Sequence, residues 1–220
     1  MTILGQDILP GKSAQLNLNV ARLHTHTPIQ VPVFVNRAKK DGPTVLLMAV
    51  VHGDEINGIE IVRRVIKNGI NKPLSGTIIC LPVFNVFGFL NLARTLPDGR
   101  DLNRCFPGSK NGSLASQFAS QFMSEIAVHA DYVIDFHTGA AHRNNAPQVR
   151  FAKKDAESEA LAAVFAPPFL VHSNFIPKSL REALYKAGKR TLLFEGGKSH
   201  SIEENAVSYT HLTLPTISSV

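Results

Sequence analysis

A histidine and a glutamate three positions apart, His52 and Glu55, are the residues of this sequence best suited to chemistry. They follow residues 44–51, an uncharged aliphatic segment typical of a strand buried on both faces. Aliphatic residues then recur at helical spacing from Ile56 to Ile66, so we expect Glu55 in the first turn of a helix. An imidazole and a carboxylate held at such a junction are two ligands of a His₂Glu zinc site. Taken alone, the pair is more often a capping carboxylate beside an ordinary histidine.

A second strand-end histidine, His137, is the candidate third ligand. Residues 131–139 form a mostly apolar segment that predicts a strand, and His137 lies near its carboxyl end. Asp135 lies two residues earlier and therefore points to the same face, where it could orient the imidazole. A strand-end histidine is more often structural when nothing else indicates a metal. Here it completes a set with His52 and Glu55 that would bind one zinc ion per chain.

Glu195 is the candidate catalytic base. It lies near the end of residues 191–197, another apolar segment that predicts a strand. An unpaired carboxylate is costly at the end of a buried strand. A glutamate beside zinc-bound water is the general base that metal-assisted hydrolysis requires. The alternative explanation is a partly exposed charge at the end of a strand.

A polar loop, residues 93–104, contains three arginines, Arg94, Arg100 and Arg104. It follows an apolar loop, residues 85–92, and a proline and a glycine within it interrupt any helical period. The planar guanidinium group binds carboxylates through paired hydrogen bonds, so the cluster indicates carboxylate recognition. A surface loop with internal ion pairs is the alternative.

The order of these segments predicts an α/β fold with a mixed, largely parallel sheet flanked by helices on both faces. The carboxyl ends of parallel strands meet at one edge of a sheet, where such folds bind ligands. Residues 1–40 predict edge strands, because residues 14–20 and 29–35 alternate with period two. The length suits one catalytic domain, residues 1–206. Residues 207–220 contain no Asp, Glu, Lys or Arg and show no clear period, so we interpret them as a non-native tail.

Composition narrows the partners that we expect. The net charge is +6, but the basic residues are scattered, which argues against nucleic acid and suits a small acidic or N-acylated substrate. No uncharged apolar segment reaches membrane-spanning length and no signal peptide is apparent, so we expect a cytoplasmic protein without a membrane partner. Cys80 and Cys105 are expected to be reduced thiols. The oligomeric state is not predicted.

Taken together, these residues resemble the succinylglutamate desuccinylase/aspartoacylase family, whose members are relatives of the zinc carboxypeptidases. The matching segments are His-Gly-Asp-Glu at 52–55, Asp-Leu-Asn-Arg at 101–104, Asp-Phe-His-Thr-Gly at 135–139 and Glu195. The resemblance implies the following roles: zinc binding by His52, Glu55 and His137, activation of water by Glu195, binding of a substrate carboxylate by Asn103 and Arg104, and polarisation of the scissile carbonyl by Arg94.

The activity that the resemblance implies is zinc-dependent hydrolysis of the amide bond of a small N-acyl amino acid. Two alternatives stay open. One is a metallocarboxypeptidase acting on peptide C-termini, and the other is a catalytically silent module that binds metal or carboxylates. Family members usually carry a smaller β-rich domain after the catalytic one, and we expect that domain to be absent from this sequence.

Overall fold

A mixed sheet forms the centre of the protein in a computed structural model that describes residues 1–153 and 155–208. Its eight strands lie in the order β3 (Ser13–Arg22), β4 (Pro28–Arg37), β6 (Thr77–Leu81), β5 (Thr44–Ala49), β7 (Tyr132–Gly139), β10 (Arg190–Lys198), β8 (Asn145–Ala152) and β9 (Phe169–Ser173). The central strands β6, β5, β7 and β10 are parallel to one another, and β8 is parallel to β9. The pairs β3–β4, β4–β6 and β10–β8 are antiparallel. The predicted mixed sheet is confirmed, with β3 and β4 at one edge.

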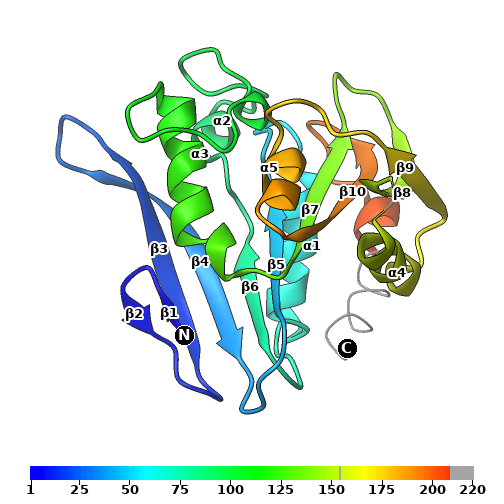
Figure 1. Cartoon of the computed structure of the whole chain (residues 1–220). Helices are drawn as coiled ribbons and strands as arrows, with labels where there is room; N and C mark the ends of the chain where they lie inside the picture. The colour runs from blue at the N-terminus through cyan, green and yellow to red at the C-terminus, as the bar shows by residue number, and fades with distance from the viewer. Residues whose placement is uncertain (154, 209–220) are drawn as a thin grey trace.

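Helices cover both faces of this sheet (Figure 1). One face packs against α3 (Leu114–Glu125) and α5 (Leu180–Lys186), and the other against α1 (Asn57–Lys67) and α4 (Ala156–Phe165). In β5, Met48 belongs to the first of these cores and Leu47 to the second, because successive side chains of a strand point to opposite faces. The burial of both faces explains why the central strands read as continuous apolar segments.

One expectation about the first helix is wrong. The helix α1 begins at Asn57, so Glu55 lies in the loop before it and not in its first turn. Glu55 N–H donates to His52 O at 3.2 Å, which closes a turn ahead of the helix. The turn directs the Glu55 side chain toward His52.

Some elements are not evident from the sequence pattern. The short helix α2 (Val86–Leu90) lies in the segment that we interpreted as an apolar loop, and β9 adds an edge strand beyond β8. A further pair of short strands, β1 (Thr2–Ile3) and β2 (Gln6–Asp7), forms a separate sheet. Such short elements contain too few residues for a period to be recognised.

Three further observations concern expectations from the sequence. Cys80 and Cys105 are both free thiols. Within residues 1–153 and 155–208, no helix has the length and apolar character needed to cross a lipid bilayer. Residues 209–220, most of the segment interpreted as a tail, lie outside the described residues.

Candidate active site

The loop that carries His52 leaves β5 through a strained turn. Val50 has a φ of 63°, in the left-handed region that β-branched residues avoid. The backbone N–H of Asn85 donates to Val50 O at 2.8 Å, and the Asn85 side chain donates to Val51 O at 3.1 Å. These bonds fix the turn that brings His52 to the edge of the sheet.

Gly53 is required because its backbone touches the backbone of α2. A Cβ atom at Gly53 would lie 1.9 Å from the carbonyl carbon of Gly88. We therefore expect Gly53→Ala to lower the free energy of unfolding by at least about 3 kcal/mol, since neither backbone can withdraw without moving the loop that carries His52. Gly99→Ala is the comparison, because a Cβ atom there meets nothing within 4 Å and only the left-handed φ of 76° is unfavourable, at about 1 kcal/mol. Equal losses in denaturant melts would contradict this explanation.

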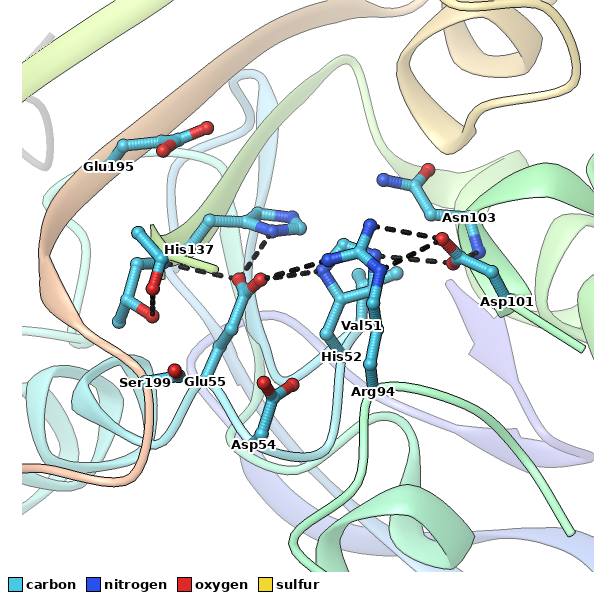
Figure 2. A network of polar contacts seen from close by, with 12 residues as sticks. Val51, His52, Asp54, Glu55, Arg94, Asp101, Asn103, His137, Glu195 and Ser199 are labelled. Carbon is cyan, nitrogen blue, oxygen red and sulfur yellow. Dashed lines mark hydrogen bonds and ion pairs between the residues drawn. The ribbon is translucent and has the colours of Figure 1, made fainter. Parts of the chain in front are cut away.

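The predicted ligands meet in the folded chain. Glu55 Oε1 lies 2.8 Å from His52 Nδ1, and Glu55 Oε2 lies 2.7 Å from His137 Nδ1. All three side chains are buried, and one ligand atom from each lies within 4.8 Å of the others. Figure 2 shows them converging from two different segments of the chain. Zinc ligands lie about 2 Å from the ion, so a small closing movement would place these atoms around one point.

The electrostatics of the three side chains suit a cation at their centre. Burial alone raises the pKa of Glu55, but the positive charges of His137 and His52 outweigh it and hold this pKa well below its usual range. Burial opposes protonation of His137, yet Asp135 and Glu55 raise its pKa well above the usual value. The pKa of His52 is also raised, by Glu55 and Asp101 against burial. The ionised carboxylate thus attracts positive charge, which a divalent ion would supply in place of the histidine protons.

Both imidazoles are oriented by a second carboxylate. Asp135 Oδ2 lies 2.7 Å from His137 Nε2, so the predicted orienting role of Asp135 fits the geometry. Asp101 Oδ1 lies 3.2 Å from His52 Nε2. This second partner was not predicted as a site residue, although it begins the Asp-Leu-Asn-Arg segment. Nothing in the local pattern indicates which histidine it would reach.

Arg94 also binds Asp101. Its Nε and Nη2 lie 3.1 and 2.9 Å from Asp101 Oδ2, and its Nη1 lies 3.5 Å from Glu55 Oε1. Burial raises the pKa of Asp101, but the opposing effects of His52 and Arg94 are larger and hold this pKa well below the usual range. Arg94 is thereby held beside the candidate ligand Glu55.

Asn103 and Arg104 follow Asp101 in the same polar loop. The side-chain oxygen of Asn103 accepts a bond of 2.8 Å from Leu180 N–H, which ties the loop to the start of α5. Arg104 is exposed, and its Nη1 donates to Asn103 O at 2.6 Å. Both residues line the cavity that His52, Glu55 and His137 also line.

Glu195 lies next to His137 across the parallel strands β10 and β7. Figure 2 shows it beside His137, at the margin of the ligand cluster. Asn145 donates a hydrogen bond to its Oε2, and Arg150 Nη1 lies 3.6 Å from its Oε1. Burial raises the pKa of Glu195, although His137 and Arg150 oppose the shift. A raised pKa makes this carboxylate a stronger base than an exposed glutamate.

One cavity of about 470 Å³ connects all the predicted residues. This volume is in the range of small-molecule sites. Three arginines that we did not predict also line it: Arg143, Arg150 and Arg181. They come from segments without a recognisable motif. Arg143 lies in a loop, Arg150 in β8 and Arg181 in α5, and these elements meet at the cavity only through the tertiary fold.

The fold and the site define an α/β protein with a buried His₂Glu set at the edge of a mostly parallel central sheet. A family model described as the succinylglutamate desuccinylase/aspartoacylase catalytic domain matches residues 41–220. The chain therefore belongs to the succinylglutamate desuccinylase/aspartoacylase family. A curated relative, the N-alpha-acetyl-L-2,4-diaminobutyric acid deacetylase of Halomonas elongata, is 34% identical over 112 residues, which cover 50% of this chain and 32% of the relative.

Solved structures share the fold. The product-bound ectoine utilization protein EutE (DoeB) of Ruegeria pomeroyi gives a TM-score of 0.82 at 24% identity, over 93% of this chain and 66% of that chain. A succinylglutamate desuccinylase/aspartoacylase of Rhodobacter sphaeroides gives 0.80 at 25% identity, over 94% and 63%. A metallo-carboxypeptidase of Burkholderia cenocepacia gives 0.69 at 16%, over 95% and 64%. The chain thus spans about two thirds of these structures and about a third of the deacetylase.

Proposed function

We propose that this chain is the catalytic part of a zinc-dependent hydrolase that cleaves the amide bond of a small N-acyl amino acid. The observation that carries the proposal is the buried set of His52, Glu55 and His137, with Glu195 and Arg94 on the same cavity. Two imidazoles and one carboxylate are the protein ligands of a catalytic zinc site that keeps one position for water. When bound, zinc would lower the pKa of a water molecule and polarise a carbonyl oxygen.

The residues of the chain supply the other parts of the reaction. Glu195 would take a proton from the attacking water and return it to the nitrogen of the leaving amine, so that amide and water become acid and amine. Arg94 would donate to the carbonyl oxygen as negative charge develops on it. Asn103 and Arg104 would hold the carboxylate of the amino acid and so fix the scissile bond in place.

The charge of the cavity supports an anionic substrate. Its lining includes five arginines, from Arg94 to Arg181, against the carboxylates of Glu55, Asp135 and Glu195. A bound zinc ion would make the cavity more positive still. The deacetylase relative is named for an N-acetylated amino acid, which supports an acyl amino acid as the substrate class.

Hydrolysis of N-acyl amino acids measured against dipeptides tests this proposal. With zinc present, we expect kcat/KM for an N-acetyl, N-succinyl or N-acetyldiamino acid to exceed that for a matched dipeptide at least about tenfold, because the cavity provides for one amino-acid carboxylate. Removal of zinc by a chelator should abolish turnover, and added zinc should restore it.

The same assay distinguishes the alternatives. Preference for dipeptides would indicate a carboxypeptidase, in keeping with the fold shared with the Burkholderia enzyme. Stoichiometric zinc binding without hydrolysis of any amide would indicate a silent binding module. Either outcome would overturn the proposed deacylase activity.

A further inference from the structure

Two fully buried asparagines flank the candidate site without lining its cavity. Asn57 and Asn85 are each 0% exposed. The side chain of each makes two hydrogen bonds to backbone groups. Since buried amides are stable only where their donors and acceptors are paired, each asparagine fixes the segments that it joins.

Asn57 joins the start of α1 to the end of β10. Its Nδ2 donates to Gly196 O at 3.1 Å, and its Oδ1 accepts from Glu203 N–H at 2.7 Å. Gly196 directly follows Glu195, where the register of β10 with β8 shifts. A shifted register interrupts the regular hydrogen bonds of the sheet. The Asn57 side chain supplies a donor to the carbonyl of Gly196 at this point. The contact is close, since a Cβ atom on Gly197 would lie 2.3 Å from Asn57 Nδ2.

Asn85 fixes the backbone just before His52. Its backbone N–H and its Nδ2 bind Val50 O and Val51 O, and its Oδ1 accepts from Gly88 N–H at 2.9 Å. Strained backbone persists only where its surroundings fix it. The left-handed turn at Val50 is therefore maintained by Asn85, and that turn delivers His52.

We propose that these asparagines are positioning residues with separable roles. Asn85 fixes His52 for metal binding, and Asn57 fixes Glu195 for proton transfer. The separation follows from their contacts: among the described residues, the side-chain bonds of Asn85 reach residues 51 and 88, whereas those of Asn57 reach residues 196 and 203. The catalytic half of the inference rests on the proposed hydrolase function.

Matched aspartate substitutions test each role with the least change of shape. In Asn57→Asp and Asn85→Asp the acceptor oxygen stays, so the bonds from Glu203 N–H and Gly88 N–H are kept. The donor is lost, and a carboxylate oxygen faces the carbonyl of Gly196 or Val51. Aspartate caps a helix about as well as asparagine, so α2 keeps its cap in Asn85→Asp.

The two variants are expected to change different quantities, kcat in one and zinc Kd in the other. Asn57→Asp should lower kcat about 10–100-fold, with KM and zinc Kd within about threefold of the wild type, by analogy with losses at residues that orient a metal site. Asn85→Asp should raise zinc Kd about 10–100-fold, with kcat at saturating zinc within about threefold. If both variants lost zinc affinity and turnover in the same proportion, the proposal would be overturned.

Hydrogen exchange provides a readout that needs no turnover. Backbone exchange should accelerate in a peptide covering residues 194–199 only in Asn57→Asp, and in one covering residues 49–53 only in Asn85→Asp. Should the wild type hydrolyse no amide, the proposed function would fail, yet exchange and zinc titration would still decide this inference. If exchange rose equally in both peptides of both variants, the proposed separate roles of Asn57 and Asn85 would be wrong.

Asn71→Asp is the control for the burial of a charge. Asn71 is also buried, and its side chain contacts Cys80 away from the site. We expect this variant to melt at a lower temperature while zinc Kd and kcat stay at their wild-type values. Losses of zinc affinity or kcat in Asn71→Asp as large as in the other two variants would show that a general loosening of the core explains all three.

Discussion

Replacement of Glu195 by glutamine is expected to lower kcat about 10²–10⁴-fold, the usual contribution of a general base. Glutamine has nearly the same volume and retains an oxygen that can accept the bond from Asn145, so the fold should be preserved. What is lost is the ability to accept a proton, which burial strengthens by raising the pKa of the Glu195 carboxyl.

Zinc affinity separates this effect from loss of the metal. Glu195 is not among the side chains that converge as candidate ligands, so Glu195→Gln should bind zinc as tightly as the wild type. Glu182→Gln is a suitable control, because Glu182 lies on the surface of α5 and pairs there with Lys186. A Glu195→Gln variant that retains a near-normal kcat would show that another group accepts the proton.

Replacement of His52 by alanine is expected to remove both zinc binding and turnover. The variant loses one of three candidate ligands, and Glu55 loses one of its two imidazole partners. Zinc at 100 times its Kd should stabilise the wild type by about 2.7 kcal/mol. This increment in the free energy of unfolding should disappear in His52→Ala, as measured by denaturant melts with zinc and with a chelator.

His24→Ala is the control for the loss of a histidine. His24 is exposed in the turn between β3 and β4, away from the cavity lining. Its replacement should leave the zinc-dependent increment and kcat unchanged. If His52→Ala kept the full increment, the zinc ion would have to bind elsewhere and the proposed site would be wrong.

Local pattern was sufficient to predict most of the framework. The apolar segments before His52, at His137 and at Glu195 all form strands of the central sheet or lead out of one. The three-residue spacing of His52 and Glu55 survives folding as a direct contact of 2.8 Å. Such features are predictable because they depend on a few adjacent residues and on the period of a strand.

Other parts of the site depend on residues that are far apart in the chain. Asp101 reaches both His52 and Arg94, and Arg150 lies beside Glu195 only because β8 pairs with β10. No spacing rule indicates these contacts, since each arises from the packing of separate loops and strands.

The sequence by itself therefore determined the main strands of the central sheet, the class of fold and the residue types of a candidate metal site. Only the tertiary structure decided that Glu55 precedes the helix and that Asn85 holds the strained turn at Val50. The physical reason is that periodicity reports which face of an element is buried, whereas the path of a loop depends on backbone hydrogen bonds to segments that the local sequence does not specify.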